Sequence, residues 1–214
     1  MKRRRVLIAG ISAALICLIL IIAYAIPPLR EDVRAIVTTT QAHLSAPATT
    51  PFPSIDTINL SQEQIKIINL ARTQYAKHPI SYDQAVLTYS QGDKQAWCAD
   101  FISWIMMRAG TPYSNPNSGS WRIPGVYTLQ QYYQSQHRYE AAGSYTPRPG
   151  DVAFYIGSND FGLTTSGHVA LVIKVNGNAM TTIGGNESGR MRIDTQPIHK
   201  GVNRLVGFGV TSAP

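Results

Sequence analysis

The chain has 214 residues, of which 44% are hydrophobic and 14% charged, and this length supports one medium-sized domain with extensions. Its formal charge of +7 is concentrated at the N-terminus. Five of the 19 basic residues precede the first acidic residue, Glu31, so that 14 basic residues face 12 acidic ones in the remainder. That remainder has no basic run and no interleaved aromatic stripe, which argues against a nucleic acid as partner.

The first segment is basic and then apolar. Residues 1–5 read MKRRR, and residues 6–26 carry no charge. A helix of that length crosses a hydrocarbon layer of roughly 30 Å, so we expect a transmembrane anchor (or uncleaved signal) at 6–26, with residues 1–5 in the cytoplasm. The rival interpretation is a cleavable signal peptide, because Ala23-Tyr24-Ala25 has the small-x-small form of a cleavage site. The apolar stretch exceeds the usual secretory core of about 7 to 15 residues, which favours the anchor.

These features predict a single-pass protein of the cytoplasmic membrane whose C-terminal domain faces the periplasm or the cell exterior. Residues 27–59 are rich in Pro, Thr, Ser and Ala, which is typical of a flexible linker. The globular domain is expected at residues 60–214.

Helical patterns come first in that domain. Ser61 and Gln64 form a capping box before a predicted helix at 62–77. A second apolar stripe predicts a helix at 96–109 that ends at Gly110, and a third helix is expected around 128–137.

The period then changes to that of strands. Short strands are predicted at 151–156, 168–175, 179–184, 190–195 and 204–210, parted by Gly and Asn. Helices followed by an antiparallel sheet indicate an α+β fold.

Cys98 stands at the start of the second predicted helix. The other cysteine, Cys17, lies in the predicted membrane span and cannot reach it, so Cys98 is an unpaired thiol in an exported domain. The positive end of the helix dipole favours a thiolate there, which is the nucleophilic form. The competing interpretation is an inert core cysteine, because Cys98 also falls on the apolar stripe. Asp100, two residues on, should face away from the sulfur and act as a charge in the cap region.

His168 opens a predicted strand, and Asn176-Gly177-Asn178 predicts a hairpin after it. Depending on which of these residues make the turn, His168 faces Gly185, Asn186 or Glu187. Opposite side chains in such a ladder lie about 5 Å apart, which is close enough for an amide or a carboxylate to hold the ring. A nucleophile, a base and an orienting group are the parts that cysteine hydrolysis needs.

Four segments resemble the ordered blocks of the CHAP domain, a family of cysteine, histidine-dependent amidohydrolases and peptidases related to the NlpC-type peptidases. The resemblance spans roughly residues 62–210 and implies a papain-like fold, with helices packed on an antiparallel sheet. It implies Cys98 as nucleophile, His168 as general base and Asn186 as the orienting residue. The four blocks are WCADFISW (97–104), PGDVAFY (149–155), GHVALV (167–172) and IGGN (183–186).

The chain departs from the family pattern at Gly184, where many members carry a glutamate. Either Asn186 or Glu187 is then left to orient His168. No metal or other cofactor is needed for this chemistry, and the histidines lack metal-ligand spacing. Trp97, Trp121 and Tyr155 are the expected substrate contacts.

The expected function is hydrolysis of an amide bond in peptidoglycan. The resemblance implies peptidoglycan as the partner and substrate of an exported amidase that is joined to the membrane by a flexible linker. One alternative is a noncatalytic domain that binds the cell wall or a partner protein. The other is a Cys-His protease or acyltransferase that acts on protein.

Overall fold

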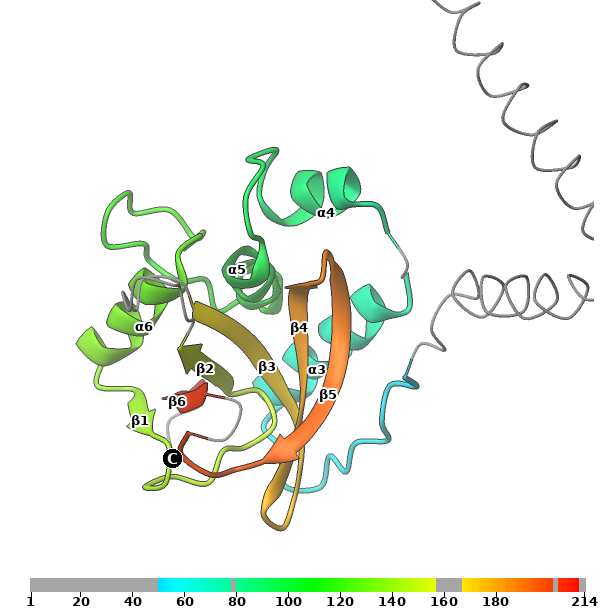
Figure 1. The fold of residues 1–214 in the computed structure, drawn as a ribbon, viewed down its shortest axis with the longest axis vertical. Coiled ribbons are helices and arrows are strands. Elements are labelled where there is room, and N and C mark those ends of the chain that lie inside the picture. The colour runs from blue at the N-terminus through cyan, green and yellow to red at the C-terminus, as the bar shows by residue number, and fades with distance from the viewer. Residues whose placement is uncertain (1–49, 78–79, 157–166, 202–203, 212–214) are drawn as a thin grey trace, which may run out of the picture. The chain divides into compact units, whose positions relative to one another are not determined.

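The computed structural model describes residues 50–77, 80–156, 167–201 and 204–211 (Figure 1). The predicted transmembrane segment and most of the predicted linker lie outside these residues. Within the described ranges, no helix is both long enough and apolar enough to span a membrane.

The first helix begins as its sequence predicts. At the start of α3 (Gln62–Tyr75), the Ser61 side chain accepts a hydrogen bond from the Gln64 backbone N–H, and the Gln64 side chain accepts one from the Ser61 N–H. This confirms the predicted capping box. The Gln64 side chain also donates to the carbonyl oxygen of Pro149, which ties the helix start to the segment before the sheet.

A second helix with the same start was missed in the sequence. Ser81 and Gln84 form another capping box at α4 (Tyr82–Tyr89). The two remaining helices match their predictions. α5 (Cys98–Ala109) ends at Gly110, whose φ of 95° lies in the left-handed region that glycine favours, and α6 (Val126–Ser135) follows a loop.

The described strands form one sheet of six in the order β1-β6-β2-β3-β4-β5, and all five neighbouring pairs are antiparallel. Five of the strands fall on predicted ones, and the short β1 at the edge was missed. Helices first and an antiparallel sheet second confirm the α+β class. The strands are β1 (Tyr139–Ala141), β2 (Val152–Ile156), β3 (Gly167–Asn176), β4 (Ala179–Glu187), β5 (Arg190–Pro197) and β6 (Leu205–Gly209).

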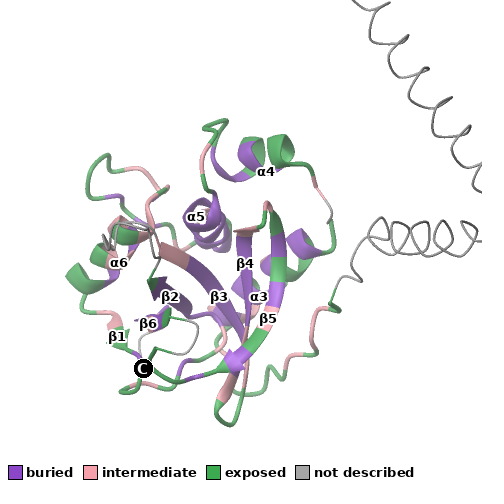
Figure 2. Cartoon of the chain, viewed as in Figure 1, coloured by how far each residue is buried: buried purple, intermediate pink, exposed green. Residues whose placement is uncertain are grey.

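Both faces of the central strands are buried (Figure 2). Along β3, Val169 and Leu171 belong to the cluster beneath the helices, whereas Ala170 and Val172 belong to a second cluster on the other face. This alternation is the period of two expected of a strand. α5 lies against β3 and β4, so its first residue is held near the ends of strands that carry the other predicted site residues.

Candidate active site

Cys98 is the first residue of α5, which confirms its predicted place at a helix start, and the residue is 5% exposed. The N-cap residue, Trp97, makes no side-chain hydrogen bond to the first turn. Backbone N–H groups at such a helix start lack helical acceptors and favour an anion nearby. Cys98 is a free thiol. Its position suits a sulfur that becomes anionic.

His168 is the second residue of β3 and pairs with Tyr155 of β2. The two rings lie 6.0 Å apart, inclined at 30°. The imidazole therefore rests beside a buried aromatic ring while one third of its side chain remains exposed (32%). This half-open position suits a group that exchanges protons with a bound molecule.

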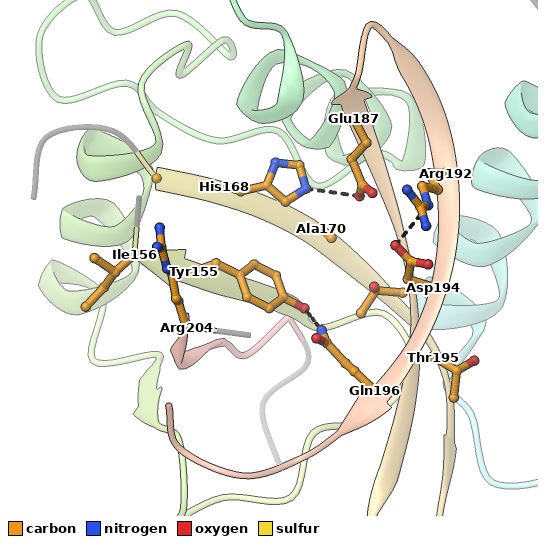
Figure 3. Close-up of a pocket in the computed structure, with 12 residues that line it drawn as sticks. Tyr155, Ile156, His168, Ala170, Glu187, Arg192, Asp194, Thr195, Gln196 and Arg204 are labelled. Atoms are coloured by element: carbon orange, nitrogen blue, oxygen red, sulfur yellow. Dashed lines mark hydrogen bonds and ion pairs between the residues drawn. The ribbon is translucent and has the colours of Figure 1, made fainter. Parts of the chain in front are cut away.

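The His168 ring has an acidic partner. Nε2 of His168 lies 3.1 Å from Oε1 of Glu187, which comes from the end of β4 (Figure 3). Burial lowers the pKa of His168, but hydrogen bonds to Cys98 and to Glu187 outweigh it and raise the pKa to about 9. Because Nε2 is turned to the carboxylate, Nδ1 is the nitrogen left for the sulfur. At neutral pH the geometry thus favours an imidazolium between a sulfur and a carboxylate.

The hairpin register explains why Glu187 reaches the ring. Asn176 pairs with Ala179, so Gly177 and Asn178 make the turn, and a bulge after Val172 then shifts the register by one residue. Ala170 accordingly pairs with Gly184, and the position that continues this register opposite His168 is that of Asn186.

Asn186 nevertheless does not provide the hydrogen bond. A further irregularity between Gly184 and Glu187 changes which side chain reaches the ring, and in the described part of the chain the Asn186 amide makes no hydrogen bond to it. Of the two candidates left open by the sequence, the structure places Glu187 on His168.

A cavity of about 670 Å³ adjoins the imidazole on the concave face of the sheet (Figure 3). Tyr155 lies across it, and its hydroxyl accepts a hydrogen bond from Gln196 of β5. Arg204 and the ion pair between Arg192 and Asp194 also line it. This volume falls in the usual range of small-molecule sites, so the cavity can hold part of a substrate. No sequence pattern marked these arginines, because Arg192 of β5 and Arg204, which directly precedes β6, come together only in the folded domain.

Of the three residues predicted to contact substrate, one lines the cavity and two do not. Tyr155 lines the cavity. Trp97 is 0% exposed and stacks on Tyr89 in the core, so we assign it a packing role instead. Trp121 is half-buried and does not line this cavity, and its role stays a prediction.

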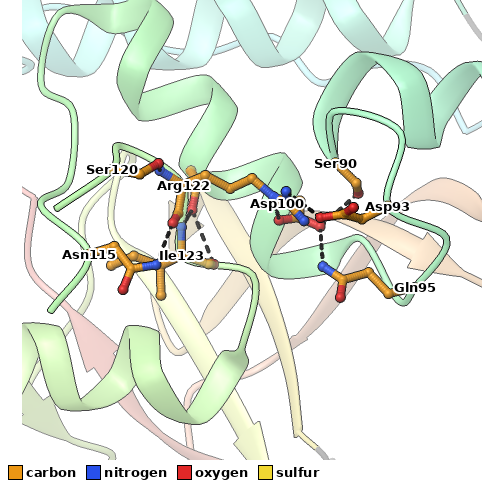
Figure 4. Close-up of polar contacts among 9 residues, drawn as sticks. Ser90, Asp93, Gln95, Asp100, Asn115, Ser120, Arg122 and Ile123 are labelled. Carbon is orange, nitrogen blue, oxygen red and sulfur yellow. Dashed lines mark hydrogen bonds and ion pairs between the residues drawn. The ribbon is translucent and has the colours of Figure 1, made fainter. Parts of the chain in front are cut away.

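Asp100, predicted as a charge in the cap region, is instead a partner in a buried ion pair. Its carboxylate is fully buried (0% exposed) and accepts hydrogen bonds from Ser90 Oγ, Gln95 Nε2 and Arg122 Nε at 2.7, 2.9 and 2.7 Å (Figure 4). Arg122 also donates to Asp93 at 2.7 Å. These contacts tie the loop before Cys98 and the loop before α6 to the start of α5. Asp100 therefore fixes the chain around the thiol without facing it.

Among the described residues there is no cluster of three or more His, Cys, Asp or Glu side chains that could hold a metal ion. The chemistry of the site is thus argued from its thiol, imidazole and carboxylate.

Residues 90–186 match the family model of the CHAP domain, which confirms the resemblance drawn from the sequence. The matched segment contains Cys98 and His168 and ends at Asn186.

Two solved structures are similar to this chain, "The crystal structure of Ly7917" and "The crystal structure of Ly7917 with the hydrolyzing product of MDP". They are 15% and 16% identical, with TM-scores of 0.36 and 0.34. The alignments cover 53% and 52% of this chain and 52% of each of those chains, so the chain spans about half of their length. The likeness is too low to carry an argument about function. No curated protein matches.

Proposed function

We propose that the protein is an exported cysteine hydrolase that cleaves an amide bond of peptidoglycan, with Cys98 as nucleophile and His168 as general acid and base. The observation that supports this most is the hydrogen-bonded pair of Cys98 at a helix start and a raised-pKa His168 beside a cavity. The CHAP match supports a hydrolase of cell-wall type.

The first half of the reaction forms a thioester. The Cys98 thiolate attacks the amide carbon, an S–C bond forms, and the carbonyl electrons move to oxygen. Backbone N–H groups at the start of α5 stabilise that oxyanion. When the tetrahedral intermediate collapses, the C–N bond breaks, and the amine takes the proton of the His168 imidazolium as it leaves.

The second half restores the enzyme. Neutral His168 takes a proton from water as the water oxygen attacks the thioester carbon. Collapse of this intermediate breaks the S–C bond and returns the Cys98 thiolate beside an imidazolium, with a carboxylic acid as product. The substrate lies in the cavity that His168 and Tyr155 line.

The proposed location is the outer face of the cytoplasmic membrane, with residues 6–26 as anchor and residues 27–59 as tether. Such a flexible tether lets the domain reach a volume of cell wall near the membrane. Alkaline extraction of membranes tests this location. The full chain should stay with the lipid, and a form that lacks residues 1–26 should be released.

Digestion of purified sacculi by the full chain, followed by mass spectrometry of the fragments, tests the function. Either cut gives one new amine and one new carboxylate. A cut at the sugar–peptide amide leaves the carboxylate on the sugar and releases the whole stem peptide, whereas a cut within the stem leaves the carboxylate on the peptide portion that stays attached to the sugar. The Cys98→Ala variant should release nothing. Fragment release by Cys98→Ala would contradict the mechanism. Intact sacculi with the wild type would favour a binding domain or an enzyme that acts on protein.

A further inference from the structure

We propose that Glu187 is the positioning residue of this site, and that a bulge in β4 together with the absent side chain of Gly184 brings its carboxylate to His168. The inference rests on the proposed function, because Glu187 acts through the imidazole. It also gives Asn186 a conformational role in place of a side-chain role.

The bulge changes which face Glu187 occupies. Gly184 pairs with Arg192 and Glu187 pairs with Arg190, so two residues of β4 stand opposite Met191 alone. Side chains alternate between the faces of a strand, and one extra residue reverses the alternation beyond it. Glu187 therefore shares the face of Gly184, whereas in a regular strand it would point to the opposite face, toward the helices.

Contacts at the neighbouring glycines support this assignment of faces. A Cβ placed on Gly184 would meet Glu187 and His168, whereas a Cβ placed on Gly185 would meet Trp97 and Phe101 in the core beneath the helices. Glu187 and His168 also line the same cavity.

Gly184 leaves the space that the carboxylate fills. An added Cβ there would lie 2.0 Å from Oε1 of Glu187 and 2.8 Å from Nε2 of His168. Both distances are shorter than any van der Waals contact between such atoms. A side chain at position 184 and the Glu187 carboxylate thus exclude each other, which explains why glycine stands at this position.

Asn186 supplies the backbone turn of the bulge. Its φ is 59°, in the left-handed region where Asn is one of the few side chains found regularly. The residue is needed there for a conformation that lets the chain deliver Glu187. Glycine adopts that conformation as well, which separates the backbone role from any role of the amide.

A carboxylate at Nε2 does more than an amide would. The carboxylate accepts a hydrogen bond from Nε2–H, which orients the ring with Nδ1 toward Cys98. Its full negative charge also stabilises the imidazolium that protonates the leaving amine. Within the described ranges, the other titratable or charged groups around the ring include Cys98 from α5, Tyr155 from β2 and, along the cavity, Arg192, Asp194 and Arg204.

The test measures the His168 ring and catalysis separately in the full chain. Histidine resonances are followed by NMR against pH, with the His168 signal assigned by its loss in His168→Gln, and fragment release from sacculi is timed under saturating and limiting substrate. Glu187→Gln should shift the His168 titration to lower pH and lower kcat at least about tenfold, with KM within about twofold. Gly184→Ala should show the same two changes, because its methyl group displaces the carboxylate.

Two further variants complete the design. Asn186→Gly keeps the left-handed backbone and lacks the amide. The His168 titration should therefore stay at the wild-type pH, and kcat should stay within about threefold of the wild-type value. Glu140→Gln removes an exposed carboxylate on β1 and serves as the matched control for loss of charge. Thermal melts of each variant check that activity is compared between folded proteins.

Wild-type titration and kcat in Glu187→Gln would overturn the inference, as would a loss in Asn186→Gly as large as that expected for Glu187→Gln. Absence of any cleavage by the wild type would contradict the proposed function instead. The NMR titration would still decide whether Glu187 holds the ring.

Discussion

Replacement of Asp100 by alanine tests the claim that a buried ion pair fixes the start of α5. Its carboxylate is fully buried, and the change leaves Arg122 Nε, Ser90 Oγ and Gln95 Nε2 without their acceptor. Removing one partner of a buried ion pair costs about 3–5 kcal/mol of folding free energy. At about 2–4 °C per kcal/mol for a protein of this size, the melting temperature should fall by roughly 6–20 °C.

Asp93 is the matched control, because its carboxylate binds the same Arg122 guanidinium as Asp100 does. Asp93 binds Arg122 at the same distance, 2.7 Å, but its side chain is 66% exposed. Exposed pairs contribute about 0–1 kcal/mol, so Asp93→Ala should melt within a few degrees of the wild type. Circular dichroism melts of the three proteins at one concentration measure the difference. A loss in Asp100→Ala no larger than in Asp93→Ala would refute the reasoning.

The remaining predictions concern the imidazole, the cavity and the contact between β4 and α5. The pKa of His168 is raised to about 9, so the imidazolium that protonates the leaving amine is present below that pH and lost above it. The value of kcat should therefore fall as the pH rises through about 9, and a constant kcat through pH 10 would contradict this. Arg204→Gln removes a cation that lines the cavity and should raise KM for acidic wall fragments several-fold with little change in kcat. Arg108→Gln, an exposed arginine in the last turn of α5 that does not line the cavity, should leave both unchanged, and equal effects of the two would count against the cavity as the binding site. Gly185→Ala should lower the free energy of unfolding by about 1–3 kcal/mol in urea titrations, because the new methyl group would lie 2.5 Å from the Trp97 ring, and a variant as stable as the wild type would show that this contact relaxes freely.

Much of the fold could be predicted because its signals are local. The capping box at Ser61, the glycine after α5 and the alternation of the strands are each written within a few residues. The helix α4 was missed although Ser81 and Gln84 repeat the capping box, since eight residues are too few to show a clear helical period. β1 was missed because its pairing partner, β6, lies far along the chain.

The sequence was enough to predict two residues of the candidate site, and it left the third open between two neighbours. Cys98 and His168 could be picked out from a helix start and a strand start, which the fold brings together. The choice between Asn186 and Glu187 depended on two bulges, one after Val172 and one after Gly184. Glycines and an asparagine within a strand permit a bulge but do not fix where the register shifts, so the side chain that reaches the ring is seen only in the structure.

The burial of Asp100 also lay beyond the sequence. A charged residue in a first helical turn is usually solvated, and nothing in its neighbourhood marks Arg122 as its partner 22 residues away. Likewise, the role of Trp97 as a core residue follows from its contact with Tyr89, which belongs to the helix that was missed.

The most direct measurement of the central claim is the rate at which iodoacetamide alkylates Cys98 at pH 6, followed by peptide mass spectrometry so that Cys17 is counted separately. At that pH only about 0.3% of an ordinary cysteine is thiolate, since its pKa is about 8.5. A sulfur held as an anion by the His168 imidazolium should react at least about tenfold faster than free cysteine, even allowing for lower intrinsic nucleophilicity, and should lose this advantage in His168→Ala. A rate below that of free cysteine, or one that His168→Ala leaves unchanged, would contradict the account.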